Sequence, residues 1–415
     1  MFDENKNLEK LLRLGRKIIP KRLFHFAQPI YHWGLSITGS ILYRWPSRSM
    51  KVIGVTGTHG KSTTVYMITR AFLAMGLPVA AISSLELRIK DKVWPNSLKM
   101  TMLGRFKIQK FLLQAKLSGC RYVILEVTSE GIKQFRHVGV KFDCAVFTNL
   151  AREHIEHHGS FEKYLFAKQK LFQATKNIHI LNRDDAHVSD LDKFRAKRKI
   201  YFGLNEGDMN QSELKLKLKL AGEFNIYNAL AALSVVRVYG LDVDRAKYAI
   251  ESIESVPGRM EFIQKDPFSV VIDYAHTPYA LEAVYRELKP KSESGKLICV
   301  FGATGGGRDK WKRPVFGQIA DQYCDQIFLT NDDPYDEDPN EIIDQIQTGI
   351  VNKDKVRVII DRREAIIEAI HIAQPTDHVV ISGKGSEDHL VLAHGKKIPW
   401  SDKEIAWEVL SKTKI

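Results

Sequence analysis

The stretch Val52-Ile-Gly-Val-Thr-Gly-Thr-His-Gly-Lys-Ser-Thr-Thr64 joins an apolar, β-branched run to a glycine-rich turn, and a helical pattern follows. A strand, a phosphate-cradling loop and a helix N-terminus have this layout. Glycines let backbone N–H groups turn toward an anion, and a lysine can reach the outer phosphates. A serine or threonine hydroxyl can bind Mg²⁺. We therefore expect a nucleoside triphosphate on Gly57, Thr58, His59, Gly60, Lys61, Ser62 and Thr63.

The loop departs from the strict pattern GxxxxGK[ST], because Val55 stands where that pattern has its first glycine. What remains is the tighter form Gly57-Thr-His-Gly-Lys-Ser. The alternative is an ordinary glycine-rich turn between a strand and a helix. The preceding strand, the following helix and the carboxylates described below favour the nucleotide.

Composition is that of an ordinary globular protein, with a net charge of +13 over 415 residues. The charge favours acidic partners such as nucleotides, phosphorylated substrates or anionic lipid. We find no nucleic-acid-binding motif and expect no nucleic acid partner. The four cysteines form no CxxC pair, and Cys144 and Cys299 lie in predicted strands. We therefore expect core thiols without a disulfide framework, in a reducing cytoplasm.

Residues 23–43 (LFHFAQPIYHWGLSITGSILY) carry no Asp, Glu, Lys or Arg and are flanked by basic residues. Their length would span a bilayer, but Gln28, Pro29, two histidines and several small polar residues weaken a spanning helix. The favoured interpretation is a helix packed on the main domain. Peripheral contact with the inner face of the membrane is the second, and a true span the third.

From Lys51 onward, apolar strands alternate with helices, which predicts a parallel sheet covered on both faces. After the turn Val256-Pro-Gly-Arg259, the same rhythm restarts. The fold class is therefore α/β. We expect a helical and aromatic segment (1–50), a central P-loop, doubly wound parallel-sheet ATPase domain (51–257) and a C-terminal Rossmann-like α/β domain (258–415). The strictly alternating LKLKLKL at 214–220 predicts an edge or hairpin strand.

Two charged groups stand where predicted strands end. Glu126 closes one strand, at the edge where open α/β sheets bind ligands, and could hold Mg²⁺; the alternative is a strand-end charge in solvent. The next strand leads into Thr148-Asn-Leu-Ala-Arg-Glu-His-Ile-Glu-His-His-Gly159. Its histidines do not have the HExxH spacing of a zinc site. Histidine is unusual for a hard cation, so spacing alone leaves the role of His154 open.

A series of motifs follows one order along residues 51 to about 395: GTHGKSTT, LEVTSEG, FTNLAREHIEHHG, FAKQKLF, FNIYNALAA, VPGRMEF, DYAHTP, GGGRDKWKRP and GKGSED. In these motifs and their order the chain resembles the Mur ligase family. Within it, the chain is most similar to the MurE type, which adds the third amino acid of the peptidoglycan stem peptide. The resemblance implies ATP and two Mg²⁺ ions as cofactors.

The resemblance also implies roles for individual residues. Lys168 matches a lysine that the family carbamylates, and a CO₂ adduct would turn a repelled ammonium into an anionic oxygen ligand. Glu126, His154 and carbamylated Lys168 would hold one Mg²⁺, and Ser62 and Glu126 the other. Without the family, Lys168 would be read as a helix-surface lysine.

Beyond the metals, Asn225 matches a residue that contacts adenine, and Asp273 matches one that binds ribose. Arg259 matches an arginine near the phosphates, and His276 lies in the same motif as Asp273. By the same resemblance, the added amino acid would be bound by Arg308, Asp332, Asp333, Tyr335, Gly383 and Glu387.

The implied chemistry is amide formation through an acyl phosphate. ATP would phosphorylate a muramoyl-peptide carboxylate, and the amine of the incoming amino acid would displace the phosphate. Lys61, the two Mg²⁺ ions and Arg259 would neutralise the charge that meets in the first step. Closure of a hinge at about 256–260 would exclude water from the acyl phosphate.

Two departures from the family pattern bear on the substrates. Only about fifty residues precede the loop strand, so we expect the usual N-terminal UDP-binding domain to be missing and the acceptor to be either UDP-linked or lipid-linked. Ligases of this type that select diaminopimelate carry Asp-Asn-Pro-Arg, whereas this chain has Asp332-Asp-Pro-Tyr335, and Ser386 replaces a usual histidine. Tyr335 cannot pair with a carboxylate. Diaminopimelate is therefore disfavoured, and lysine or ornithine is expected unless Arg308 compensates.

Other functions stay open at this point. The chain could be a folylpolyglutamate- or cyanophycin-type ligase of the same superfamily, or a non-catalytic scaffold with the ligase fold. The motifs EHIEHHG and VPGRMEF favour the MurE type, and the presence of Lys61, Glu126, His154 and Lys168 argues against a scaffold.

Overall fold

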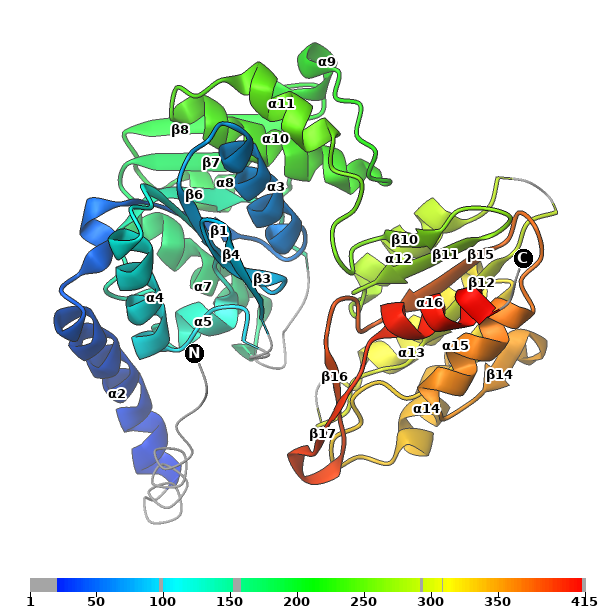
Figure 1. Ribbon diagram of the computed structural model, residues 1–415. Coiled ribbons are helices and arrows are strands. Elements are labelled where there is room, and N and C mark those ends of the chain that lie inside the picture. Colours follow the sequence, from blue (N-terminus) through cyan, green and yellow to red (C-terminus); the bar gives the residue numbers. More distant parts are fainter. Residues whose placement is uncertain (1–20, 97–99, 152–157, 292–293, 308, 413–415) are drawn as a thin grey trace. The chain divides into compact units, whose positions relative to one another are not determined.

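The computed structural model describes residues 21–96, 100–151, 158–291, 294–307 and 309–412 (Figure 1). Its contacts divide the chain into two compact units. The described residues of Met1–Leu150, Phe161–Leu216 and Ile226–Ile250 form the first unit, and those of Ala151–Ser160, Lys217–Asn225 and Glu251–Ile415 form the second.

The elements of the first unit begin with a helix and continue as alternating strands and helices. They are α2 (Lys21–Leu42), η1 (Pro46–Ser49), β1 (Lys51–Thr56), α3 (Lys61–Ala74), β2 (Val79–Ile82), β3 (Glu86–Ile89), β4 (Lys92–Pro95), α4 (Arg105–Leu117), β5 (Tyr122–Glu126), α5 (Ser129–Lys133), β6 (Phe142–Phe147), α7 (Phe161–Ala174), β7 (Ile178–Asn182), α8 (Val188–Asp192), β8 (Arg198–Gly203), β9 (Met209–Asn210), α9 (Gln211–Leu214), α10 (Glu223–Val238) and α11 (Val243–Glu251).

The nine-stranded sheet of this unit has the order β4-β3-β2-β5-β1-β6-β7-β8-β9. The strands from β2 to β9 in this order pair in parallel, and β3 and β4 add an antiparallel hairpin at one edge. The central strand β1 has β5 on one side and β6 on the other. The carboxyl ends of these three strands therefore meet at one edge of the sheet, where doubly wound folds bind ligands.

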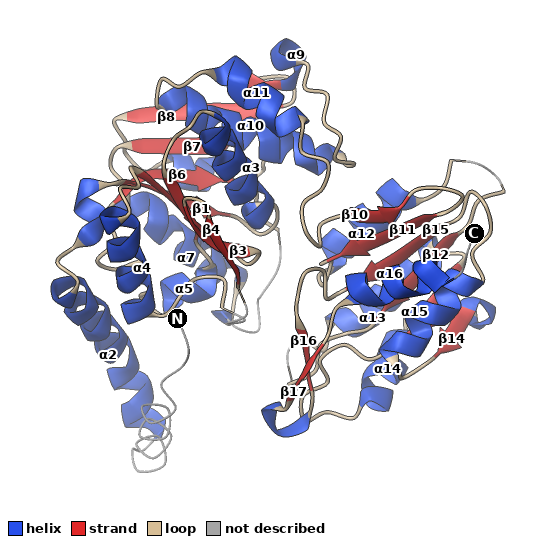
Figure 2. Ribbon diagram, in the orientation of Figure 1, coloured by secondary structure: helices blue, strands red, loops and turns tan. Residues whose placement is uncertain are grey.

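Helices cover both faces of this sheet (Figure 2). On one face, α4 buries Ile108, Phe111, Leu112 and Ala115, a spacing that places all four on one side of the helix. They share a core with β-strand residues and with the buried side of α7. On the other face lies α3, whose Phe72 ring packs edge-on against Tyr122 of β5.

The second unit restarts the alternation of strands and helices. Its elements are β10 (Glu261–Gln264), β11 (Ser269–Asp273), α12 (Pro278–Leu288), β12 (Leu297–Phe301), α13 (Lys312–Tyr323), β13 (Gln326–Leu329), α14 (Pro339–Gln347), η2 (Lys353–Lys355), β14 (Val356–Val358), α15 (Arg362–His371), β15 (His378–Ser382), β16 (His389–Val391), η3 (Ala393–Gly395), β17 (Lys397–Pro399) and α16 (Asp402–Lys412).

Its six-stranded sheet has the order β10-β11-β15-β12-β13-β14, and all pairs except β10–β11 are parallel. One core lies between the sheet and α12, α13 and α14, and another lies between the sheet and α15 and α16. The strands β11, β13 and β15 end in the segments that carry Asp273, Asp332 and Gly383. The α/β class with large parallel sheets is therefore confirmed.

Two expectations about local structure are wrong. The segment 214–220 forms no strand: α9 ends at Leu214, and the residues that follow bury Leu216 and Leu220 without a partner strand. The backbone N–H of Lys217 instead donates to the carboxylate of Glu251, 2.8 Å away. Alternation shows that one side of a segment is buried, but a strand also needs a neighbour for its backbone groups.

The second error concerns the cysteines. Cys299 of β12 and Cys324 at the end of α13 are joined by a disulfide, whereas Cys120 and Cys144 are free and buried. Twenty-five residues separate the paired cysteines in the sequence, so spacing gave no sign of the pair. Burial of all four thiols agrees with the expectation of core residues; the expectation that no disulfide forms does not hold.

Candidate functional site

The glycine-rich loop joins β1 to α3 at the carboxyl edge of the first sheet. Gly60 precedes the first residue of α3 with φ +79°, a conformation that favours glycine. A side chain at Gly57 would place its Cβ 1.9 Å from the hydroxyl of Thr148, so only glycine fits there. The absence of a side chain at Gly57 thus lets the loop lie directly against Thr148 at the end of β6.

The loop is held by two residues at the end of β6 that the sequence analysis did not single out. The backbone N–H of Thr58 donates to the carbonyl of Asn149, and that of His59 donates to the Asn149 side chain, both over 2.9 Å. The hydroxyl of Thr148 donates to the carbonyl of His59 over 2.7 Å. Both residues stand in Thr148-Asn-Leu, directly after a predicted strand, and that position could have identified them.

Oxygen ligands gather next to the loop. The hydroxyls of Ser62 and Ser84 are 2.8 Å apart, and the backbone N–H of Ser84 donates to the carboxylate of Glu126 over 2.9 Å. Hydroxyl and carboxylate oxygens are the donors that Mg²⁺ prefers, so this group fits a magnesium ion. Ser84 is another residue that was not predicted from the sequence; it stands two residues after the end of β2.

The side chain of Lys168 points from α7 into the core of the first unit and is 2% exposed, so it is not a helix-surface lysine. Its ammonium nitrogen donates to the carbonyl of Gly57 over 2.6 Å and lies 4.5 Å from the ring of Tyr164. Burial, and after it the charge of Lys61, hold the pKa of Lys168 well below its ordinary value, although the Glu126 carboxylate raises it. A lowered pKa favours the neutral amine.

Two other predicted groups of this unit have distinct positions. The ammonium of Lys61 donates to the carbonyl of Thr58 over 2.7 Å, so this lysine folds back on its own loop. Thr63 is buried in the first turn of α3. His154 lies outside the described residues.

A cationic cluster near the end of α5 was also missed. Arg105 donates to the carbonyl of Gln134, and Arg136 donates to the side chain of Gln134 and to the carbonyl of Met102. Burial lowers the pKa of both arginines, that of Arg105 to about 10, and the charge of Arg136 lowers it further. No ion pair with a carboxylate joins either arginine to another described residue. A half-buried cation next to a buried one suits an anionic ligand.

In the second unit, Asp273 closes β11 and is fully surrounded. Its carboxylate accepts from the backbone N–H groups of Met260 and Ala275 over 2.7 and 2.6 Å. Burial raises the pKa of Asp273, whereas the neighbouring charge of Arg259 and the two N–H groups lower it. The guanidinium of Arg259 lies 4.3 Å from the ring of Tyr274. Asp273 and Arg259 are therefore neighbours.

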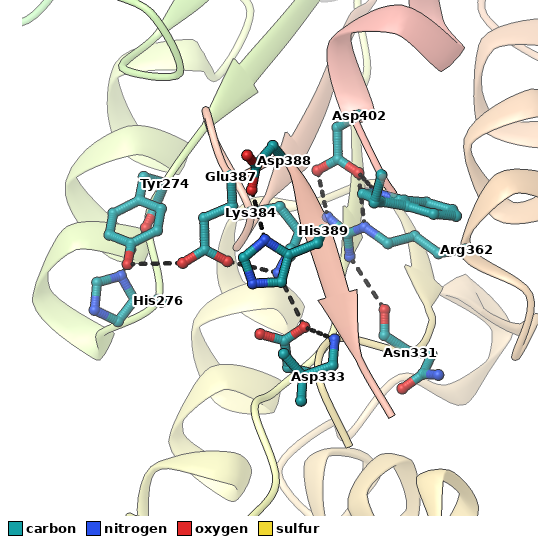
Figure 3. Close-up of polar contacts among 12 residues, drawn as sticks. Tyr274, His276, Asn331, Asp333, Arg362, Lys384, Glu387, Asp388, His389 and Asp402 are labelled. Carbon is teal, nitrogen blue, oxygen red and sulfur yellow. Dashed lines mark hydrogen bonds and ion pairs between the residues drawn. The ribbon is translucent and has the colours of Figure 1, made fainter. Parts of the chain in front are cut away.

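Two of the residues predicted to bind the added amino acid, Asp333 and Glu387, contact one buried lysine (Figure 3). The ammonium of Lys384 donates to the Asp333 carboxylate over 3.0 Å and to the Glu387 carboxylate over 2.5 Å. The hydroxyl of Tyr274 donates to the other oxygen of Glu387 over 3.3 Å. Lys384 is 1% exposed, and the carboxylates raise its pKa above the ordinary value despite burial. The sequence analysis named both carboxylates but not the cation between them.

Asp332 is buried on the same edge. A Cβ at Gly383 would lie 2.3 Å from the Asp332 carboxylate, so the glycine keeps the two chains close. Burial raises the pKa of Asp332 to about 6, whereas the cations Arg362 and Lys384 lower it. Arg362 in turn forms a fully buried ion pair with Asp402 at 2.8 Å.

The remaining predicted residues make other contacts. The backbone N–H of Tyr335 donates to the carbonyl of Val391, and the ring packs beside Gly306. The side chain of Asn225 donates to the carbonyl of Ala221 over 2.7 Å. His276 bonds through Nδ1 to the carbonyl of Tyr274. Arg308 lies outside the described residues.

Comparisons with known proteins agree with these two half-sites. Residues 55–236 match the family model of the Mur ligase middle domain, and residues 258–385 match that of the Mur ligase glutamate ligase domain. The chain is 37% identical to a UDP-N-acetylmuramoyl-L-alanyl-D-glutamate–2,6-diaminopimelate ligase of Aquifex aeolicus, over 88% of this chain and 78% of that protein. A ligase of the same name from Thermosynechococcus vestitus is 36% identical, over 89% and 78%.

Solved structures give the same result. A ligase of that name has a TM-score of 0.62 and 29% identity, covering 92% of this chain and 83% of its own. A folylpolyglutamate synthase of Mycobacterium tuberculosis reaches a TM-score of 0.66 at 18% identity, which shows a shared fold. The folylpolyglutamate-type and scaffold alternatives are not favoured.

These relatives correct the expectation about the amino acid. The relatives are named diaminopimelate ligases, so the inference from Tyr335 that diaminopimelate is disfavoured is wrong. That inference assumed that position 335 alone supplies the cation for a carboxylate. The structure places other cations, Lys384 and Arg362, beside Asp332 on the same sheet edge.

The two matched domains, together with relatives of more than 30% identity along most of the chain, lead to one conclusion. The chain belongs to the Mur ligase family and is an ATP-dependent, amide-bond-forming ligase of peptidoglycan precursor synthesis.

Proposed function

We propose that this ligase joins 2,6-diaminopimelate to UDP-N-acetylmuramoyl-L-alanyl-D-glutamate. The observation that carries the proposal is the similarity to ligases named for this reaction, which extends through both the loop unit and the unit with Lys384. The matched regions cover 78% of these relatives. That the N-terminal UDP-binding domain is missing is not confirmed, and residues 1–20 lie outside the described residues.

In the proposed site, the loop from Gly57 to Thr63 binds the ATP phosphates, and Lys61 turns outward to meet the outer ones. Ser62, Ser84 and Glu126 hold one Mg²⁺ through oxygen atoms, as their 2.8 and 2.9 Å contacts allow. Glu126, His154 and a carbamylated Lys168 hold a second. The two ions supply charge neutralisation when the acceptor carboxylate approaches the triphosphate.

Carbamylation of Lys168 is supported by its surroundings. The neutral amine attacks CO₂, a C–N bond forms, and one proton leaves, so that the product is an anionic carbamate. Only the neutral amine reacts, and burial lowers the pKa of Lys168 in that direction. The negative charge of the carbamate would also attract the positive charge of nearby Lys61.

The second unit would contribute the rest. Asn225 contacts the adenine, Asp273 the ribose and Arg259 the phosphates. Asp333, Tyr335, Gly383, Glu387 and Arg308 surround diaminopimelate, with Asp332 behind them. Diaminopimelate carries ammonium and carboxylate groups. The Glu387 carboxylate would attract an ammonium, and the Lys384 ammonium would attract a carboxylate.

The acceptor needs a site for its own negative charge. We assign Arg105 and Arg136 to it, because the first is a half-buried and the second a buried cation, and neither has a carboxylate partner among the described residues. The acceptor carboxylate takes the γ-phosphoryl group, ADP departs, and the amine of diaminopimelate displaces phosphate from the acyl phosphate. The proposal further includes a cytoplasmic enzyme that associates peripherally with the inner face of the membrane through residues 23–43.

A panel of amino acids tests the proposal. The purified chain is incubated with ATP, Mg²⁺ and UDP-N-acetylmuramoyl-L-alanyl-D-glutamate, and phosphate release and product mass are measured. We expect turnover with diaminopimelate and weaker turnover with lysine or ornithine. Absence of turnover with diaminopimelate, while another amino acid reacts, would contradict the proposed substrate; absence of turnover with all of them would contradict the acceptor.

A further inference from the structure

Helix α2 packs against the first unit through its small and polar side. The hydroxyl of Ser36 donates to the carbonyl of Phe135 over 2.8 Å, and Ser36 is 1% exposed. Ser40 is fully buried, and a Cβ at Gly139 would lie 1.8 Å from its hydroxyl. Gly39 lies against the backbone of Arg105. The helix is therefore held closely, beside α4 (Figure 1).

Several apolar side chains of α2 are exposed. Ile30 is 65% exposed, Trp33 50%, Ile41 61% and Leu42 64%, and Tyr31 lies beside them at 45%. We call these five residues the outer face of α2. Surface helices normally turn polar residues to water and apolar ones to the core. In α2 the order is reversed, and clustered exposed apolar residues mark a binding surface.

The charge around this face has one sign. No Asp or Glu occurs from residue 10 to residue 85, or from residue 92 to residue 125. The first range includes α2 with its flanking basic residues, and the second includes α4, with Lys110 and the exposed Lys116. Arg44 and Arg48 are exposed just after α2. An apolar face between cations complements a surface that is apolar inside and anionic at its rim.

We propose that the outer face of α2 docks on an anionic lipid bilayer, with the helix lying in the plane of the headgroups. This inference rests on the proposed peripheral association and identifies its residues and its lipid class. None of the helices in the described ranges is long and apolar enough to cross a membrane. Trp33 and Tyr31 suit the headgroup layer, because their rings are apolar with one polar atom.

Flotation of the full-length chain with vesicles tests the proposal. One set of vesicles is pure phosphatidylcholine, and the other contains three parts phosphatidylcholine to one part phosphatidylglycerol. We expect binding to the anionic vesicles that weakens with added salt. Ile41→Glu should weaken this binding by about tenfold or more. It replaces an apolar side chain that the bilayer would cover by a negative charge that anionic lipid repels. Val351→Glu, at an 87% exposed valine of the second unit, is the matched control and should bind like wild type.

The competing occupants of the face give different results. If wild type stays free of both vesicles, or if Ile41→Glu binds like wild type, the proposal is overturned. If wild type ignores vesicles but self-associates in sedimentation, and Ile41→Glu does not, the face is an interface between copies instead. Ligase activity is measured without vesicles in every variant, so a failure of membrane docking is distinct from a failure of the proposed reaction.

Discussion

At the scale of single residues, Lys168 has the most unusual surroundings in the first unit. An ammonium there would face burial and the charge of Lys61, which the Glu126 carboxylate opposes. We expect Lys168→Ala to reduce acceptor-dependent ADP formation by about 100-fold or more, because a charged ligand of the reacting centre is lost. Added formate or acetate should restore part of the activity by occupying the place of the carbamate.

The control for this variant is Lys163→Ala. Lys163 lies on the same helix α7 but is exposed, so its removal should leave the rate within about twofold of wild type. Full activity of Lys168→Ala would contradict the carbamate. Loss of activity without any rescue, in a protein with an unchanged melting temperature, would leave Lys168 a place in the site but not the carbamate.

Asp332 gives a prediction about pH. Its pKa in the folded protein is raised from 3.8 to about 6 by burial. Between about pH 4 and pH 6, the folded protein therefore holds a proton on Asp332 that the unfolded chain has already released. This proton stabilises the folded state at low pH, and the stabilisation is lost as the pH rises through about 6. Asp332→Asn, neutral at every pH, should be more stabilising at pH 7.5 than at pH 4 by about 3 kcal/mol.

Thermal unfolding of the two proteins at both pH values measures this difference. Asp336→Asn, at an exposed carboxylate of the same segment, is the control. A pH-independent difference between Asp332→Asn and wild type would show that the pKa of this carboxyl is the same in the folded and unfolded protein, and that Arg362 and Lys384 offset its burial.

At the scale of elements, two ion pairs join α15 to α16, and they differ in burial. Arg362–Asp402 is fully buried, and Trp400 also donates to Asp402. Asp402→Ala should destabilise the second unit by about 3–5 kcal/mol, because it leaves a buried guanidinium uncompensated. The surface pair Arg363–Glu408 joins the same helices, and Glu408→Ala should leave the melting temperature unchanged. Equal effects of the two substitutions in calorimetry would contradict this account.

Helices and strands were predicted from the sequence better than contacts between single residues were. The strands that carry Glu126 and Asp273 end where their motifs indicate, because a buried parallel strand is a long apolar run closed by a polar residue. The strand predicted for the segment LKLKLKL does not form, because an alternating pattern does not show whether a partner strand lies beside the segment. Ser84, Lys384 and the Cys299–Cys324 pair were missed because each depends on a neighbour far away in the sequence.

At the scale of the whole molecule, the two units carry different parts of the proposed reaction. The loop, the metal ligands and Lys168 belong to the first, and the groups around Lys384 belong to the second. Each set is held by contacts within its own unit, such as Ser62–Ser84 and Lys384–Glu387. Substitutions within one of these two sets should therefore change the handling of one substrate and leave that of the other intact.

Two conservative variants measure this division. Ser84→Ala should raise the KM for Mg²⁺-ATP by about tenfold and leave the KM for diaminopimelate within about twofold, since it removes the hydroxyl that contacts Ser62 and is a proposed oxygen ligand of Mg²⁺. Glu387→Gln should do the reverse, because it removes the charge opposite an ammonium while keeping the shape and the contact with Tyr274. Steady-state kinetics with each substrate varied in turn gives all four values. If Glu387→Gln changes the KM for ATP as strongly as that for diaminopimelate, the Glu387 carboxylate affects the binding of both substrates and not of the amino acid alone.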